Sequence, residues 1–305
     1  SSEKGKDRKW KERKINNINL AKAFEELEYK ISENVFSCAE ILRYKQQADG
    51  SLKLYQTWFC KNKLCPICNW RRAMKYSYQT SLIVDEAIKR FPKGRFLFLT
   101  LTVKNVVGDE LNQAMSEMTK AFNRLTRYKK VDKNMLGYVR ATEVTQKEER
   151  DDYHPHMHIL IFVKSSYFAN SDNYISQNDW TDLWKKAAKL DYTPIVDIKA
   201  VKPKNKNSDD PNGMRKAILE TAKYPVKPME FDSENIEVVR DLHEGMHRKR
   251  LISFGGIFKE IRKELELDNI EEGDLINTSD DDTTSTTAQE IVAIWNWDRE
   301  NYFVR

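Results

Sequence analysis

Runs of apolar and alternating residues in the middle of the chain predict a group of β-strands. Residues 96–103 are almost all apolar and β-prone, which is typical of a buried central strand. Residues 138–145 and 156–163 have the pattern of two further strands, and the charged residues between them resemble a hairpin tip. Residues 195–201 predict one more strand. We expect strand 96–103 to lie beside the hairpin in an antiparallel sheet.

Apolar residues at helical spacing predict helices in the segments that flank these strands. Ser176 is a suitable N-cap, with Asp179 three residues later, and Pro92 ends a long helix that starts at Trp70. The clearest stripe, which we interpret as core packing, consists of Leu111, Met115, Met118, Phe122 and Leu125. The predicted helices cover residues 20–31, 70–91, 111–125, 176–187, 214–224 and 259–267. These helices and strands together indicate an α+β protein.

Composition and charge indicate the class of the protein and its partner. Charged residues make up 32% of the chain, and no apolar run approaches the length of a bilayer span, so we expect a cytoplasmic protein without a membrane partner. The net charge of +5 is uneven, because residues 265–305 hold 11 acidic and 2 basic side chains and leave +14 on residues 1–264. A region this basic favours a polyanion as its partner.

The same features predict three regions along the chain. Residues 1–91 are expected to form a basic arm, a helix and a cysteine-rich region, with the arm mobile over residues 1–16. Residues 92–264 are expected to form the main domain. Residues 265–305 are expected to form an acidic, partly disordered tail, whose apolar patch near Trp297 is suited to docking on the protein or on a partner.

The cysteines have the pattern of a metal site. All of them lie within the first 68 residues, as Cys38, Cys60, Cys65 and Cys68. A predicted hairpin over residues 41–59 brings the first cysteine towards the other three, which have the spacing C-x4-C-x2-C. Four thiolates suit a closed structural zinc site, and a reducing cytosol disfavours disulfides. A redox motif is the alternative, but no βαβ pattern surrounds these residues.

Basic and aromatic residues follow the cysteines directly. Arg71, Arg72 and Lys75 lie at the start of the predicted helix 70–91, next to Tyr76. Basic side chains contact DNA phosphates, and aromatic rings stack on bases. We therefore interpret the three basic residues as candidates for DNA binding, with a solvated helix face as the alternative.

Three histidines occupy five positions at residues 154–158, where the last of the hairpin strands begins. Side chains alternate along a strand, so His156 and His158 project from the same face. Glu143 lies roughly opposite them if the two strands pair antiparallel. Two imidazoles and a carboxylate are able to bind a divalent metal ion. The same set suits a non-haem iron oxygenase, and hydrogen-bonded core histidines are the alternative without a metal.

The predicted helix 214–224 carries a second group of polar residues. Glu220 and Tyr224 are four residues apart and so share one helix face. The basic residues of the same region are Lys216, Lys223 and Lys227. A tyrosine hydroxyl, with an ordinary pKa of about 10, becomes an effective nucleophile where cations favour the phenolate and a metal polarises its target. An ordinary exposed helix face is the alternative.

Three motifs occur here in the order found in HUH endonucleases. They are Phe-Leu-Thr-Leu-Thr at residues 98–102, His156-Met157-His158, and Glu220-x3-Tyr224. With them, the chain resembles rolling-circle plasmid replication initiators of the Gram-positive type. The cysteine cluster and residues 250–256 are also similar to this group, so the resemblance covers roughly residues 36–262. The order, spacing and joint presence of the motifs make the match specific.

The resemblance implies a fold and a metal. The fold is a five-stranded antiparallel sheet with packed helices, the HUH endonuclease fold. Glu143, His156 and His158 match metal ligands, and the metal is Mg²⁺ or Mn²⁺, acting as a Lewis acid on the scissile phosphate. His154 departs from the two-histidine pattern, either as a group behind the ligands or as a hairpin residue. Pro155 argues against a strand that continues through this position.

The resemblance also implies an activity. Tyr224 matches the nucleophile that attacks a backbone phosphate at the plasmid double-strand origin, which leaves a 5′-phosphotyrosine and a 3′-OH primer. Glu220 matches a carboxylate that assists the terminating cleavage, by strand transfer or hydrolysis. The chain has no G-x4-G-K-[ST] motif for ATP, so a host helicase is an expected partner beside the replication machinery. A homodimer is an open alternative to a monomer.

A second class of function remains open at this point. A zinc-containing DNA-binding regulator without catalysis explains the charge and the cysteines. It gives no reason for histidines that face a carboxylate.

Overall fold

The computed structural model describes residues 9–146, 151–169, 171–201, 236–278 and 289–305, with the backbone of two short strands before residue 9. The chain forms two compact units. The first unit comprises Ser1–Lys75, Pro228–His243 and Asn269–Arg305, and the second comprises Tyr76–Lys227 and Glu244–Asp268. These limits differ from the boundaries predicted after residues 91 and 264, because the end of the chain pairs with strands near its beginning.

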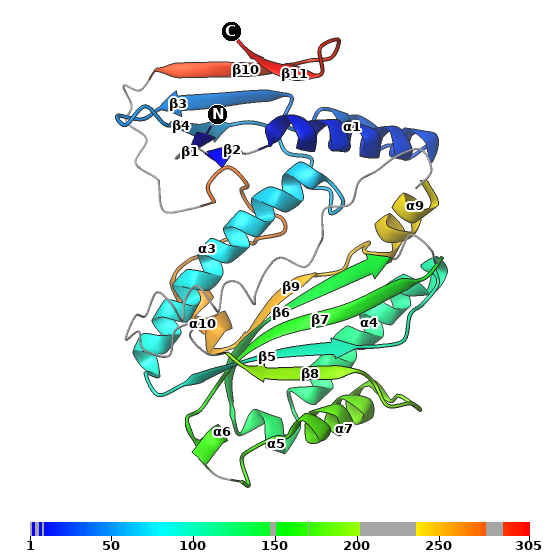
Figure 1. Cartoon of the computed structure of the whole chain (residues 1–305), viewed down its shortest axis with the longest axis vertical. Coiled ribbons are helices and arrows are strands. Elements are labelled where there is room, and N and C mark those ends of the chain that lie inside the picture. The colour runs from blue at the N-terminus through cyan, green and yellow to red at the C-terminus, as the bar shows by residue number, and fades with distance from the viewer. Residues whose placement is uncertain are drawn as a thin grey trace. The chain divides into compact units, whose positions relative to one another are not determined.

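The second unit is built on a five-stranded antiparallel sheet with the spatial order β8-β5-β7-β6-β9 (Figure 1). Its strands are β5 (Arg95–Thr102), β6 (Met135–Gln146), β7 (Tyr153–Val163), β8 (Val196–Ala200) and β9 (Ile252–Gly256). The central strand is β7, which pairs with β5 on one side and β6 on the other. The α+β class and the five-stranded antiparallel sheet expected from the sequence are confirmed.

Two helices cover one face of this sheet, α4 (Gly108–Leu125) and α7 (Gln177–Ala188). The buried stripe of α4 is the one predicted from the sequence. Its later residues, Met118, Phe122 and Leu125, share one core with alternate apolar residues of β5 and β7, namely Leu97, Leu99, Leu101, Met157, Ile159 and Ile161. Within this core Trp184 Nε1 donates a hydrogen bond to the Thr102 carbonyl oxygen (2.8 Å), which ties α7 to the end of β5. Functional side chains of the sheet are therefore left to its other face.

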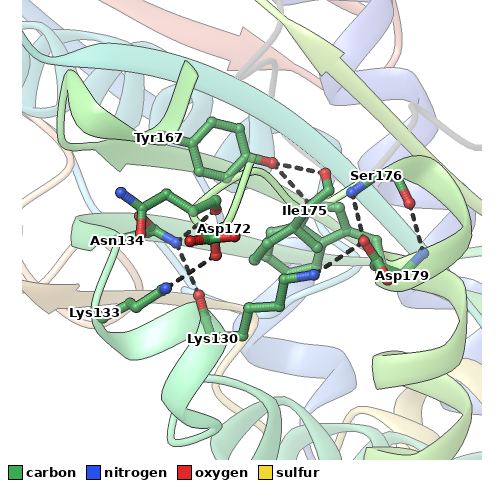
Figure 2. Close-up of polar contacts among 10 residues, drawn as sticks. Lys130, Lys133, Asn134, Tyr167, Asp172, Ile175, Ser176 and Asp179 are labelled. Atoms are coloured by element: carbon green, nitrogen blue, oxygen red, sulfur yellow. Dashed lines mark hydrogen bonds and ion pairs between the residues drawn. The ribbon is translucent and has the colours of Figure 1, made fainter. Parts of the chain in front are cut away.

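Polar contacts fix the start of α7 (Figure 2). The Asp179 amide donates to Ser176 Oγ (3.1 Å), and the Ser176 amide donates to Asp179 Oδ2 (3.0 Å), which is the predicted capping box. Lys130 Nζ lies 3.1 Å from the same carboxylate oxygen. Tyr167 donates to the Ile175 carbonyl (2.9 Å). These contacts join α7 to α5 (Lys129–Asp132) and α6 (Ser166–Ala169).

An aromatic cluster fills one end of the opposite face. The Phe162 ring of β7 stacks on Phe96 of β5, with ring centroids 4.6 Å apart. It also contacts Phe91, near the end of α3 (Pro66–Arg90), and Phe258 of α10 (Ile257–Glu264). The other end of this face, beyond Leu160 along β7, carries the predicted histidines.

The first unit contains a four-stranded antiparallel sheet in the order β11-β10-β3-β4 (Figure 1). Its strands are β3 (Ile41–Gln46), β4 (Leu52–Gln56), β10 (Glu290–Asn296) and β11 (Asn301–Val304). The apolar patch predicted near Trp297 is thus largely a β-hairpin that docks on β3 of the same chain. Tyr302 donates to the Ala39 carbonyl (2.7 Å), and the Trp295 amide donates to the Glu40 carbonyl (2.9 Å).

Two helices of the first unit precede these strands, α1 (Trp10–Glu26) and α2 (Ser32–Phe36). The sequence predicts a mobile arm up to residue 16, and this prediction is wrong from Trp10 onwards. Trp10 is buried and packs edge-on against Trp70, with ring centroids 4.9 Å apart. Lys14 and Asn17 continue the buried stripe of α1. Tertiary contacts of this kind stabilise a helix whose composition alone is typical of a solvated segment.

The remaining described elements are α9 (Ile236–Gly245), β1 (Ser2–Glu3) and β2 (Lys6–Asp7). Of the helices within the described ranges, none is long and apolar enough to cross a bilayer.

Candidate metal centres

The hairpin of β6 and β7 brings one carboxylate and two imidazoles together. Across it, Glu143 pairs with His156, and Ala141 pairs with His158. Directly opposed residues of an antiparallel pair point to the same face, so all three ligand candidates emerge where α4 and α7 do not cover the sheet. The small side chain of Ala141 leaves room for the carboxylate to reach the second imidazole. We refer to Glu143, His156 and His158 as the triad.

The atoms of the triad converge on one point. Glu143 Oε2 lies 3.1 Å from Nε2 of His156 and 3.1 Å from Nε2 of His158. His156 Nδ1 lies 3.1 Å from the His154 carbonyl oxygen, which only accepts, so Nδ1 carries a proton. A neutral His156 then directs its Nε2 lone pair at the Glu143 carboxylate oxygen, and the two electron-rich atoms repel each other. A cation on Nε2, either a proton or a metal ion, removes this repulsion.

The spacing of the triad fits an octahedral metal ion. Two ligand atoms about 2.1 Å from such an ion, at adjacent positions, lie about 3.0 Å apart. The two separations of 3.1 Å match this value, and the three ligand atoms all lie within 4.8 Å of one another. The His158 side chain is 25% exposed and that of Glu143 is 9% exposed. A substrate can therefore approach the imidazoles while the carboxylate stays shielded from water.

Residues of β5 hold His158 from behind. Thr100 Oγ1 lies 3.2 Å from His158 Nδ1, which leaves Nε2 to face Glu143. The Phe98 ring stacks on the imidazole, with centroids 5.5 Å apart and an angle of 12° between the planes. Both residues belong to the motif at residues 98–102, but the sequence alone assigned a role to neither. The sequence pattern that could have identified them is the alternation of side chains along β5. It places Phe98 and Thr100 on the same face as the triad once Thr100 is paired with His158.

The histidines lower the pKa of the Glu143 carboxyl. Burial by itself raises this pKa, but hydrogen bonds from His156 and His158, with their charge, outweigh burial and lower it from 4.5 to about 2. The carboxylate is therefore ionised at any physiological pH, as a metal ligand needs to be.

His154 belongs to β7, contrary to the expectation that Pro155 interrupts the strand. The amide and carbonyl groups of Tyr153 both bond to Val106. Pro155, two residues further on, directs its nitrogen to that same side, where β5 has already ended at Thr102. The missing N–H of proline therefore costs no ladder hydrogen bond. The backbone of His154 contributes to the site, because its carbonyl orients His156.

The four cysteines form a second cluster, entirely within the first unit. Their sulfur atoms are 3.7 Å apart for Cys38 and Cys65, 3.6 Å for Cys38 and Cys68, and 3.7 Å for Cys60 and Cys68. A disulfide has a sulfur separation of about 2.05 Å, so these are free thiols. Four sulfurs about 2.3 Å from a tetrahedral zinc ion lie about 3.8 Å apart, which the observed spacing matches.

Local structure sets the positions of these cysteines. Cys38 lies in the short segment between α2 and β3, Cys60 follows β4, Cys65 immediately precedes α3, and Cys68 lies in the first turn of α3. The Cys68 amide lies 3.5 Å from Cys65 Sγ, and the Cys60 amide lies 3.4 Å from Cys38 Sγ. Amide groups directed at sulfur favour the thiolate form that a metal requires. The hairpin predicted from the sequence thus brings Cys38 to the other three.

Arg71, Arg72 and Lys75 lie in the interior, which contradicts their expected role in contacting DNA. All three are buried, with exposed fractions of 2%, 2% and 4%. Their acceptors include the backbone carbonyls of Asn62, Glu271, Asp274, Leu275 and Ile276. The three cations therefore hold residues 271–276 and the loop before Cys65 against the first turns of α3. The interleaved basic and aromatic residues indicated a solvent-facing surface. In the structure, the basic side chains instead donate hydrogen bonds to backbone oxygens.

The second polar group predicted from the sequence lies outside the described residues. It consists of Lys216, Glu220, Lys223, Tyr224 and Lys227.

Comparison with known proteins identifies the family. A family model described as Replication protein (Rep_1) matches residues 51–303. The "Protein rep" of Streptococcus pneumoniae is 55% identical over 307 residues, which cover 100% of this chain and 94% of that protein. The "Protein rep" of Lactiplantibacillus plantarum is 47% identical over 311 residues, covering 99% and 97%. A "Replication protein" of Staphylococcus aureus is 49% identical over 237 residues, covering 76% and 100%. No solved structure matches the chain. The chain therefore belongs to the Replication protein family, which confirms the resemblance to plasmid replication initiators that its motifs indicated.

Proposed function

We propose that this protein starts plasmid rolling-circle replication by nicking one DNA strand at the double-strand origin, as an endonuclease of the HUH type. The observation that supports this most strongly is the convergence of Glu143 Oε2 with Nε2 of His156 and of His158, 3.1 Å in each case. Their spacing and the mixed oxygen and nitrogen ligand set favour Mg²⁺ or Mn²⁺. When bound there, the ion supplies Lewis-acid polarisation of the scissile phosphate.

The nucleophile in this proposal is Tyr224. Its phenol oxygen forms a bond to phosphorus, the bond from phosphorus to O3′ breaks, and the phenol proton is lost. The departing O3′ takes up a proton and becomes the 3′-hydroxyl that primes synthesis, while the 5′-phosphate stays on the tyrosine. Glu220, one helical turn away in the sequence pattern, acts as general base in the terminating cleavage.

The proposed DNA contacts come from Lys216, Lys223 and Lys227. These lysines lie close in sequence to Tyr224, so their charge would favour both phosphate binding and the phenolate. Arg71, Arg72 and Lys75 are buried, so we do not propose that they contact DNA. A host helicase and the replication machinery are the proposed partners, because the chain has no ATP-binding motif of its own.

We also propose that Cys38, Cys60, Cys65 and Cys68 bind a structural zinc ion. The spacing of the sulfurs supports a tetrahedral site, and free thiols support thiolate coordination. Freshly purified protein should contain one zinc ion per chain, measured by elemental analysis. Protein without zinc, with all four thiols titrating freely, would contradict this.

The nicking proposal is tested with a supercoiled plasmid that carries a candidate origin. Converting both His156 and His158 to Ala should abolish formation of the nicked circle, and EDTA should do the same to the wild type. His247→Ala is the matched control, because His247 is exposed and not part of the triad. Duplex binding, measured by gel shift, should remain in the double variant.

The same assay separates the alternatives. A non-catalytic zinc-containing regulator would bind the origin but never nick it, with or without the triad. If binding and nicking fell together in the double variant, the histidines would be maintaining the fold instead of holding a metal.

A further inference from the structure

Two buried cations flank the cysteine cluster. Lys14 of α1 is 0% exposed, and its Nζ donates to the carbonyl oxygens of Phe36 (2.5 Å) and Cys38 (2.8 Å). Arg72 of α3 is 2% exposed. Its guanidinium donates to the carbonyl oxygen of Asn62 (3.0 Å) and to Asn69 Oδ1 (3.2 Å), among other neutral groups. Both side chains therefore reach the loops that carry the cysteines.

The hydrogen bonds of these cations do not balance their charge. Every hydrogen-bond acceptor of Lys14 and Arg72 in the described part of the chain is a backbone carbonyl or a side-chain amide. In those residues, no carboxylate oxygen forms an ion pair with either cation. Burying a charge without a counter-charge is costly, so the fold should supply negative charge close by.

Both cations bind the backbone beside a sulfur ligand. Lys14 Nζ donates to the carbonyl oxygen of Cys38 itself, and the Arg72 guanidinium donates to the carbonyl oxygen of Lys61, the residue that follows Cys60. Arg72 also lies one helical turn after Cys68 on α3. One cation from α1 and one from α3 therefore lie where four zinc-bound thiolates would place negative charge.

We propose that Lys14 and Arg72 neutralise the cysteine cluster when it holds zinc, so that the buried site carries no net charge. The inference rests on the proposed zinc site. A zinc ion with four thiolates has two negative charges in excess, and the two buried cations are equal to them in number. Lys14 and Arg72 are positioning residues here, since neither is a ligand.

This neutralisation has two consequences for the metal. The charged cluster becomes less costly to bury, which strengthens zinc binding. The thiolates also become poorer nucleophiles, because a nearby positive charge stabilises their electron pairs. Reagents that alkylate sulfur, by displacing iodide from iodoacetamide for example, should therefore release zinc slowly from the wild type.

The test compares charge-removing and charge-retaining variants of the full chain. Lys14→Met keeps the aliphatic chain but removes the charge, Lys14→Arg keeps the charge, and Lys11→Met is the matched control from an exposed position of α1. Zinc affinity, measured by competition with a chromogenic chelator, should fall about ten- to one-hundred-fold in Lys14→Met. It should stay close to wild type in the other two variants. Zinc release by iodoacetamide should be faster in Lys14→Met alone.

A spectroscopic measurement distinguishes charge from packing. In the cobalt-substituted protein, loss of the Lys14 charge should move the thiolate-to-cobalt charge-transfer band to lower energy. Equal zinc affinity in Lys14→Met and wild type would overturn the proposal, and so would equal losses in Lys14→Met and Lys14→Arg. A wild type that binds no zinc would contradict the zinc site itself, and this inference with it.

A second background keeps the test decisive if Lys14→Met fails to fold. Cys60→His replaces one thiolate by a neutral imidazole and so removes one negative charge from the cluster. In this background Lys14→Met should fold and should lose less zinc affinity than it does with all four cysteines. A loss as large as in the four-cysteine protein, or a failure to fold that persists, would overturn the proposal.

Discussion

Residues behind the triad orient its imidazoles towards the proposed metal position. The His158 imidazole is held by Thr100 through Nδ1 and by the Phe98 ring through stacking. Groups that orient a metal-binding histidine in this way typically contribute ten- to one-hundred-fold to metal affinity. The Thr100 hydroxyl is therefore expected to support the proposed metal site through its contact with His158.

Thr100→Val should lower Mn²⁺ affinity about ten-fold, because it keeps the shape of the side chain but removes the partner of His158 Nδ1. Titration of Mn²⁺ followed by electron paramagnetic resonance measures this. Thr181→Val is the control, since the Thr181 hydroxyl donates to the Gln177 carbonyl within α7. An affinity unchanged by Thr100→Val would show that the hydroxyl does not orient the imidazole.

Glu143 gives the metal-free protein a defined pH dependence. Its pKa is lowered from 4.5 to about 2, so the stability it contributes is fully present above pH 4.5 and is lost as the pH falls towards 2. Glu143→Gln removes the titrating group. The difference in unfolding free energy between wild type and variant, measured by urea titration with EDTA present, should shrink over this window. A difference that stayed constant from pH 4.5 to pH 2 would contradict the role given to the histidines.

The C-terminal hairpin, formed by β10 and β11, supports the cysteine cluster. β10 pairs with β3, and Tyr302 and the Trp295 amide bind the carbonyls of Ala39 and Glu40, the two residues that follow Cys38. The hairpin therefore fixes the segment that positions one of the four sulfurs.

A chain ending at residue 289 should lose zinc to a chelator faster than the full chain, because β3 becomes an unpaired edge and the Cys38 segment loses its anchors. Thermal unfolding should also begin at a lower temperature. Asp298→Ala, in the exposed turn between β10 and β11, is the control. Unchanged zinc release from the shortened chain would show that the hairpin is dispensable for the site.

Elements with a strong local pattern could be predicted from the sequence. The stripe of α4 and the capping box of α7 depend only on residues a few positions apart. The β6 and β7 hairpin is also local, so the alternation of its residues was enough to predict that Glu143 lies opposite the histidines. The positions of Thr100 and Phe98 required the pairing of β5 with β7, which joins segments far apart in the chain.

Elements stabilised by distant contacts could not be predicted. Trp10, Lys14 and Asn17 are spaced as the buried face of a helix, but two of the three are polar, so the pattern suggested a solvated arm. The partners of Lys14 lie beyond α1, in the segment at Phe36 and Cys38. Arg71, Arg72 and Lys75 were misplaced for the same reason, since their acceptors lie in residues 271–276 and in the loop before Cys65.

The two candidate metal centres belong to different units of the molecule. The cysteine cluster consists of residues from the first unit, and the triad consists of residues from the second. Each set of ligands therefore comes from residues of one unit alone.

Replacing Cys65 and Cys68 together by Ser should abolish zinc binding and leave Mn²⁺ binding at the triad within about two-fold of wild type, because additivity holds for sites that share no partners. Elemental analysis and Mn²⁺ titration of the same sample report the two centres. Loss of Mn²⁺ binding in parallel with zinc would show that the two units do not fold independently of each other.

Mass spectrometry of the covalent complex tests most directly the proposal that Tyr224 forms a bond to DNA during cleavage. Wild-type protein incubated with Mn²⁺ and an origin oligonucleotide should give an adduct, and digestion should place the nucleotide on the peptide that contains Tyr224. Tyr224→Phe should give no adduct, whereas Tyr192→Phe, which alters a tyrosine whose hydroxyl accepts a hydrogen bond from the Lys104 amide, should react as wild type does. An adduct formed by Tyr224→Phe, or located on any other residue of the wild type, would contradict the claim.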